Sequence, residues 1–140
     1  MITMIVKRVE TEEEQQDAYD IRKQVFVYEQ KVPLEIELDE YERESVHFIA
    51  YKQLIPVGAA RVRKVDNEAK VERVCVLKTY RQAGIGHLLM KEIEDFANKQ
   101  NWLPIRLHAQ LEAFPFYEKI GYITCAVLFY EATPSHVARK

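Results

Sequence analysis

The sequence contains few cysteines, glycines and prolines: its 140 residues include 2, 4 and 5 of them. Cys75 and Cys125 lie far apart in apolar runs, so we expect buried, reduced side chains rather than a disulfide-rich scaffold. No apolar run approaches the ~20 residues that cross a bilayer. The first ten residues lack the basic start and long apolar run of a signal peptide. We therefore expect a cytoplasmic protein with no membrane partner.

Neither sign of charge is in large excess. The chain has 20 Lys and Arg against 22 Asp and Glu, a formal net charge of -2. A nucleic-acid-binding domain normally carries a basic excess on one face, so we expect no nucleic-acid partner. The histidines show no metal-ligand spacing with each other or with a cysteine, so we expect no metal. Repeats, low-complexity tracts and linkers are missing too, which favours one domain over residues 1–140.

The apolar pattern predicts the element order β-α-β-β-β-α-β-α-β, an α/β sheet with mixed strand directions. After a strand at residues 2–9, Thr11 and Glu14 form a capping-box signature that starts a helix. The apolar face of this helix consists of Ala18, Ile21, Val25 and Phe26. Three strands with short connections follow, which indicates an antiparallel meander. These strands are expected at residues 46–51, from about 56 to 65, and 70–77.

A second helical pattern begins near residue 85. Its apolar face is expected to contain Ile85, Leu88, Leu89, Ile93, Phe96 and Ala97. A short strand at 105–109 and a helix at 111–119 follow, and Pro115 fits only in the first turn of that helix. Gly121 is placed to end the helix in the left-handed conformation. A β-type run at 123–130 completes the pattern and offers an edge for a possible homodimer.

Residues 28–45 contain Pro33 and many acids against only two cations. One interpretation is a solvated acidic loop, and the other is a lid that attracts a cationic substrate. The acids are Glu29, Glu35, Glu37, Asp39, Glu40, Glu42 and Glu44.

The segment Arg81-Gln82-Ala83-Gly84-Ile85-Gly86 leads from a strand into a helix and predicts an anion site. The first N–H groups of a helix have no intrahelical acceptor, and the helix dipole adds positive potential there. Gly84 and Gly86 have no Cβ, so a pyrophosphate can approach the backbone, and Arg81 adds a cation. A Walker loop is excluded, because His87 and Leu88 follow Gly86. A dinucleotide fingerprint is excluded, because the turn follows a meander.

This segment resembles the acetyl-CoA motif of the GNAT (Gcn5-related N-acetyltransferase) superfamily, Arg/Gln-x-x-Gly-x-Gly/Ala. About thirty residues later, Ala113-Phe114-Pro115-Phe116-Tyr117-Glu118-Lys119-Ile120-Gly121-Tyr122 resembles the second signature of that family. A set of residues near the N-terminus resembles the small bacterial ElaA-like branch, and His136 also fits it. They are Arg22, Val25-Phe26-Val27, Glu29-Gln30, Glu37 and Asp39. The resemblance implies the GNAT acyl-CoA N-acyltransferase fold, with a mixed, mostly antiparallel sheet, flanking helices and two splayed parallel central strands.

The resemblance also implies where acetyl-CoA binds. Its pantetheine arm would lie between strands 71–77 and 105–109, paired with the backbone of Cys75 and Val76. Gln110 stands where many members have asparagine, and its amide offers the same hydrogen-bonding groups. Phe116 would form part of the wall. The pyrophosphate would be held by Arg81 and the N–H groups of Gln82, Ala83, Gly84, Ile85, Gly86 and His87.

The reaction implied by the resemblance is direct attack of an amine on the thioester. A backbone N–H near Val76 would stabilise the oxyanion, and Tyr117 would protonate the leaving sulfur. Glu72 is the first candidate for the general base, although pairing with Arg61 or Arg73 is as good an interpretation. Glu29 and Asp39 are rival bases, and with Gln30 they would contact the acceptor.

Three functions stay open at this point. An active acetyltransferase would use a small-molecule or protein amine as its acceptor. A regulatory module would bind acetyl-CoA without catalysis. A plain phosphate or nucleotide binder would use only the helix N-terminus.

Overall fold

The computed structural model describes residues 3–34, 39–81, 83–130 and 133–139, and for residues 110, 111, 124–130 and 133–139 it describes the backbone alone. Gln82, Glu35 and Glu37 therefore lie outside the described residues, as do the side chains of Gln110, Cys125 and His136. Every predicted helix and strand has a counterpart in the described residues, and one further strand follows them.

The strands form one seven-stranded sheet in the order β1-β2-β3-β4-β5-β7-β6. The predicted antiparallel meander, β2 to β4, is confirmed, and β1 also pairs antiparallel with β2. The last strand, β7, was not predicted, because its sequence has weak apolar alternation and contains Pro134. It forms through backbone pairing with β5 on one side and β6 on the other. The strands are β1 Met4–Arg8, β2 Val46–Lys52, β3 Ile55–Val65, β4 Glu68–Val76, β5 Ile105–Gln110, β6 Ile123–Tyr130 and β7 Thr133–Arg139.

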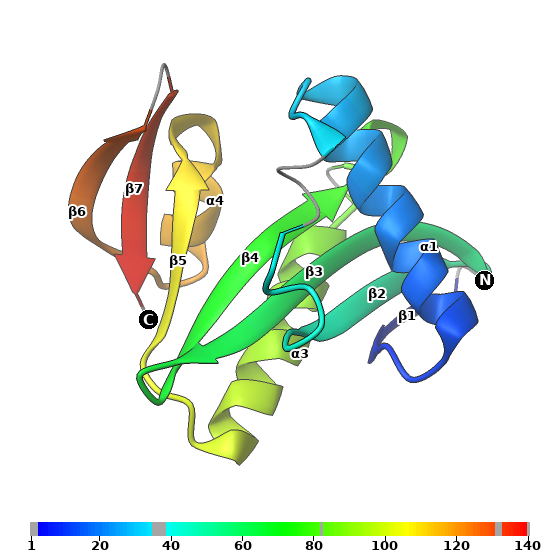
Figure 1. The fold of residues 1–140 in the computed structure, drawn as a ribbon, viewed down its shortest axis with the longest axis horizontal. Coiled ribbons are helices and arrows are strands. Elements are labelled where there is room, and N and C mark those ends of the chain that lie inside the picture. The colour runs from blue at the N-terminus through cyan, green and yellow to red at the C-terminus, as the bar shows by residue number, and fades with distance from the viewer. Residues whose placement is uncertain (1–2, 35–38, 82, 131–132, 140) are drawn as a thin grey trace.

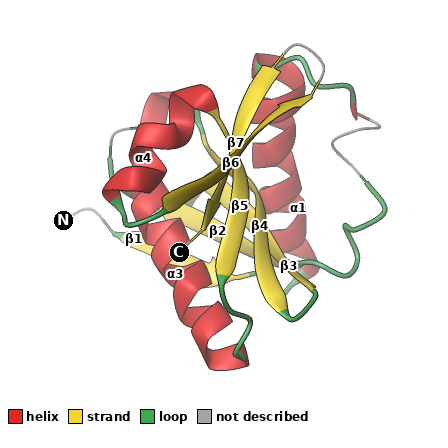
Figure 2. Ribbon diagram, turned by 90° about the vertical axis from the view of Figure 1, so that its left-hand side faces the viewer, coloured by secondary structure: helices red, strands yellow, loops and turns green. Residues whose placement is uncertain are grey.

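The main helices lie on both faces of the sheet. Figure 2 shows α1 on one side and α3 with α4 on the other. The Thr11 capping box is confirmed, because the Glu14 N–H donates to Thr11 Oγ1 over 3.1 Å and the Thr11 N–H donates to Glu14 Oε1 over 3.2 Å. No helix among the described residues is long and apolar enough to cross a membrane. The helices are α1 Glu12–Arg22, its π-helical continuation η1 Lys23–Glu29, α3 Ile85–Gln100 and α4 Phe114–Lys119, with short 3₁₀ turns at Lys78–Tyr80 and Leu111–Ala113.

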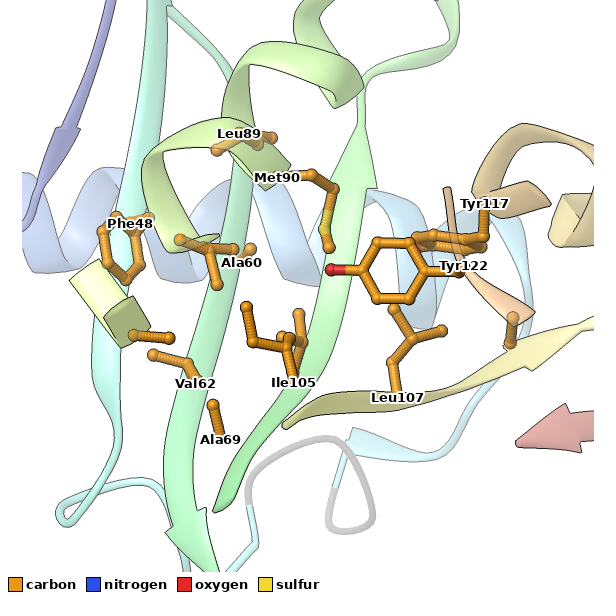
Figure 3. Close-up of a cluster of buried hydrophobic side chains, with 14 of the residues drawn as sticks. Phe48, Ala60, Val62, Ala69, Leu89, Met90, Ile105, Leu107, Tyr117 and Tyr122 are labelled. Carbon is orange, nitrogen blue, oxygen red and sulfur yellow. The ribbon is translucent and has the colours of Figure 1, made fainter. Parts of the chain in front are cut away.

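The larger hydrophobic core lies between α3 and the sheet (Figure 3). Leu89, Met90 and Ile93 are fully buried there against strand residues such as Val62. The prediction for Leu88 was wrong, since that side chain is 40% exposed, and Met90 takes the position in the core. At 100° per residue, Leu88 falls well outside the stripe that Met90 and Ile93 share.

The two central parallel strands separate, as predicted. β4 and β5 pair over only three residues each, from Ala69–Ile105 to Val71–Leu107. Beyond that point the strands diverge, and β5 continues with β7 and β6 as a separate wing of the sheet (Figure 1). A smaller apolar cluster lies between the N-terminal helical region and the other face of the sheet. Its members are Ala18, Ile21, Val25, Ile49, Ala59 and Cys75.

Candidate active site

A cavity of about 700 Å³ opens beside the diverging part of β4, between the start of α3 and helix α4. It brings together most of the residues expected to bind the donor and the predicted acid Tyr117. The lining residues from the prediction are Gln30, Cys75, Val76, Arg81, Gly84, Ile85, Gly86, His87, Phe116 and Tyr117. Val25, Tyr80, Lys119 and Ile120 also line it and were not predicted.

A bulge in β4 shapes one wall of this cavity. Ala59 pairs with Cys75 while Arg61 pairs with Glu72, so β4 has one residue more than β3 between those pairs. Arg73 absorbs the mismatch in a left-handed conformation, with φ of 59°. Bulges of this kind re-aim the strand and are common beside active sites. The described pairing of β4 with β5 ends at Val71, so the following backbone edge is available to an extended ligand arm.

The start of α3 forms a second wall. Gly84 adopts φ of 79°, which favours glycine, and nothing lies within 4 Å of the position where its Cβ would be. No side chain among the described residues caps this helix start, which leaves the first amides of α3 available to an anion. Glycine is needed at position 86 for a different reason from the one expected, because a Cβ there would lie 3.2 Å from the Phe116 ring. Gly84 therefore provides the turn, and Gly86 provides the space for α4 to approach.

Arg81, the cation expected beside the phosphate, is fixed by three hydrogen bonds within the protein. Its Nε donates to the Val76 carbonyl over 2.9 Å, and its two terminal nitrogens donate to the Glu29 carboxylate over 2.8 and 2.7 Å. These bonds tie the end of η1 to the loop before α3. The hydrogen bonds from Arg81 also hold the pKa of Glu29 below its usual range. Lys119 provides a cation of the same cavity.

Tyr117 lines the cavity and is only 7% exposed. Its ring makes edge-on contacts with Phe116 and Tyr122, at centroid distances of 5.0 and 5.9 Å. Burial raises the pKa of the phenol well above its ordinary value, and the nearby Cys75 thiol acts in the same direction. The phenol therefore stays protonated at neutral pH and can donate.

Glu72 is held by cations on the α1 face of β4. Its Oε1 accepts from Arg61 Nε over 3.1 Å and from Arg63 Nε over 2.9 Å, and Lys70 Nζ lies 3.7 Å from Oε2. The structure thus shows the pairing with Arg61 that the sequence left open. Burial alone would raise the pKa of Glu72, but the three cations hold it below its ordinary value.

The acidic segment is fixed by two fully buried arginines, a role that sequence reasoning did not assign to either of them. Arg61 donates to both oxygens of Asp39 over 2.9 and 2.6 Å, and Arg22 donates to both oxygens of Glu42 over 2.7 and 2.9 Å. Neither Asp39 nor Glu42 is simply solvated, so the solvated-loop interpretation is wrong for this part of the segment. The available signal was an arginine at a position where the pattern of α1 or β3 favours an apolar residue.

Metal binding has no structural basis in the part of the chain that the structure describes. No group of three or more His, Cys, Asp or Glu side chains there could hold an ion.

Two solved structures are similar to this chain over its whole length. ElaA of Escherichia coli superimposes with a TM-score of 0.82 at 25% identity and covers all of both chains. An acyl-CoA N-acyltransferase from Pseudomonas aeruginosa gives the same TM-score and identity and covers 100% of this chain and 99% of its own. Among curated proteins, the uncharacterized N-acetyltransferase YjcF of Bacillus subtilis is 48% identical over 111 residues, 79% of each chain.

The sequence model described as the acetyltransferase (GNAT) domain matches residues 7–138. The protein therefore belongs to the GNAT family and is an acetyltransferase. The resemblance to this superfamily and to ElaA is confirmed.

Proposed function

We propose that the protein transfers an acetyl group from acetyl-CoA to a primary amine, by direct attack within a ternary complex in the cytoplasm. The observation that carries this proposal is the shared cavity of the β4 edge, the uncapped start of α3 and Tyr117. Each provides one requirement of the reaction: pairing for an extended arm, hydrogen bonds for a diphosphate, and a proton for a leaving thiolate.

The residues around the cavity fit acetyl-CoA as the donor. The backbone of Cys75 and Val76 lies on the part of β4 beyond its pairing with β5, where a pantetheine arm can add hydrogen bonds like a strand. The first amides of α3 and the Lys119 ammonium would hold phosphate groups. Gln82 and Gln110 stay predictions as further donor contacts.

The proposed chemistry needs two proton transfers. An alkylammonium has a pKa near ~10, so the acceptor must lose a proton before its nitrogen attacks the carbonyl carbon. A backbone N–H near the β4 bulge would stabilise the oxyanion, a contribution commonly of about 3 kcal/mol. Tyr117 would then donate its phenolic proton to the sulfur as the carbon–sulfur bond breaks. Glu72 stays the base predicted from sequence, although its ion pairs make it a weak one.

The acceptor class stays a small-molecule or protein amine. Gln30 lines the cavity and is the predicted acceptor contact that fits best. Glu29 and Asp39 engage arginines, which reduces the negative potential they offer to a cationic acceptor. A homodimer through β6, which ends the strand order of the sheet, also stays a prediction. Size-exclusion chromatography with light scattering would test it.

A regulatory module that binds acetyl-CoA without turnover is the second candidate. The specific observation in its favour is that Glu29, Asp39 and Glu72 are all engaged by arginines. A catalytically inactive relative would be expected to lose a free base while retaining the donor site.

Two measurements separate these candidates. In a thermal shift assay with acetyl-CoA, CoA, ATP and NAD, a donor at 100 times its Kd should stabilise the fold by about 2.7 kcal/mol. Stabilisation by ATP or NAD alone would contradict donor binding. Free-thiol release from acetyl-CoA is then measured against polyamines, aminosugars, amino acids and lysine peptides. Turnover above hydrolysis identifies an acetyltransferase of amines, whereas binding without turnover supports the regulatory module.

A further inference from the structure

All three carboxylates considered as bases are held by arginines. Glu29 is bonded to Arg81, while Asp39 and Glu72 share the buried Arg61. Each ion pair favours the ionised carboxylate and lowers its affinity for a proton. Abstraction of a proton from an ammonium group therefore calls for a different side chain near the point where β4 and β5 part.

His108 occupies that point on β5. Val71 and Leu107 form the last parallel pair of the two strands, so His108 is the first residue of β5 beyond the pairing. Leu107 and Ala109 are buried in the core under α3. Because side chains alternate along a strand, His108 projects from the opposite face, where its side chain is exposed. This is also the face that carries Glu72.

The charged groups around His108 keep its imidazole neutral. The ring of His108 is only partly exposed: its partial desolvation is the main cause that lowers its pKa, the cations Lys70 and Arg106 lower it further, and Glu72 opposes them. From β7, Val137 pairs with His108 in register and Arg139 pairs with Arg106. A neutral imidazole at pH 7 has a free lone pair and can accept a proton.

We infer that His108 is the general base of the amine acetylation proposed above, on which this inference rests. One ring nitrogen of His108 takes a proton from the acceptor ammonium, directly or through one water, and the amine nitrogen bonds to the thioester carbonyl carbon. The carbon–sulfur bond then breaks, and the sulfur leaves with its electron pair and takes the Tyr117 proton. The second proton lost by the nitrogen returns to the Tyr117 phenolate through solvent. The proton on His108 is released to bulk water.

The test is the pH dependence of kcat/KM for the best amine of the panel. The wild-type profile should have an acid limb with its inflection below 6.5, the ordinary value for histidine. His108→Gln should lower kcat/KM at pH 7 about 100-fold and abolish this limb. Its acetyl-CoA Kd and melting temperature should stay near wild type. Added imidazole should restore part of the rate, which a purely structural role of His108 would not allow.

Glu72→Gln is the competing variant. If His108 is the base, Glu72→Gln keeps the acid limb and is not rescued by imidazole. An active wild type whose His108→Gln variant keeps its rate and its limb overturns the inference and leaves the proposed function intact. A wild type that turns over no amine overturns both.

Discussion

The two faces of the sheet bury different kinds of side chains. The face under α3 is closed by apolar and aromatic side chains such as Leu89 and Met90. The face under α1 contains a smaller apolar cluster, and beside it two arginines that are fully buried with three carboxylates around them. The cavity opens between the start of α3 and α4, while the acidic segment is bonded to the polar face.

The two faces therefore have different roles: the apolar face stabilises the fold, and the polar face positions the acidic segment. Apolar burial is favourable at any pH and has no directional requirement. A buried ion pair loses hydration energy that its attraction only roughly offsets, so it is weak evidence for stability. Arg61, however, fixes Asp39 and Glu42 on one side and Glu72 on the other. Its role is to hold a loop with no regular secondary structure in one place against β3 and β4.

The largest effect is expected from breaking the polar face. Arg61→Met should lower the free energy of unfolding by about 3–5 kcal/mol, because three carboxylates lose a buried partner. Leu89→Ala on the apolar face should cost a comparable amount, about 3 kcal/mol, through its cavity. Urea unfolding measures both. An Arg61→Met protein as stable as wild type would show that the polar network only offsets its own desolvation.

Tyr117→Phe should lower kcat about 100-fold through loss of the general acid. The acetyl-CoA Kd should change little, because the aromatic contacts of the ring remain. Tyr122→Phe is the matched control: its hydroxyl donates to Glu94 Oε2 over 2.9 Å within the α3 face. That variant should lose about 1 kcal/mol of stability and keep its turnover. Unchanged turnover in Tyr117→Phe would remove the acid assignment.

Lowering the pH should destabilise the polar face of the sheet and leave the stability of the apolar face unchanged. The pKa values of Asp39, Glu42 and Glu72 are lower than usual: burial opposes this, but their arginine partners outweigh it. The unfolded chain then binds more protons, so their contribution is present above about pH 4.3 and is lost as pH falls through the folded values. Burial also lowers the pKa of His47, so the unfolded chain again binds more protons than the folded one. The stability that neutral His47 contributes is therefore lost as the pH falls below about 6.5.

Urea titrations at several pH values would check this dependence. The destabilisation caused by Arg61→Met should shrink as the carboxylates become protonated, while that caused by Leu89→Ala should stay constant. Parallel pH curves for the two variants would contradict the assignment of the network.

The smallest effect concerns the turn before α3. Gly84→Ala should cost about 1 kcal/mol of stability, because alanine is strained at positive φ. It should also weaken acetyl-CoA several-fold, because the turn aims the first amides of α3. Gly121→Ala provides the control, since Gly121 has φ of 104° and follows α4 outside the residues that line the cavity. Isothermal titration should show weaker binding only for Gly84→Ala.

The apolar face was largely predictable from the sequence, and the polar face was not. Helical periodicity identified most of the buried side of α3, and Thr11 with Glu14 marked the start of α1. Residues of the glycine segment and of the Phe-Tyr signature line one cavity, as their proposed role in donor binding requires. The bonds of Arg61 and Arg81 join residues up to 52 positions apart, and no local pattern specifies which carboxylate each arginine meets. β7 escaped prediction for the same reason, since its two neighbouring strands define it.

The hydrogen bonds between Arg81 and Glu29 limit how the glycine turn can be moved into another protein. The glycine turn looks like a portable strand-loop-helix module, but its first residue is anchored to the end of the N-terminal helical region. Transplanting residues 68–100 alone into another sheet would leave that anchor behind. Sequence changes around residue 29 would therefore alter the binding affinity at a loop 52 residues further along the chain.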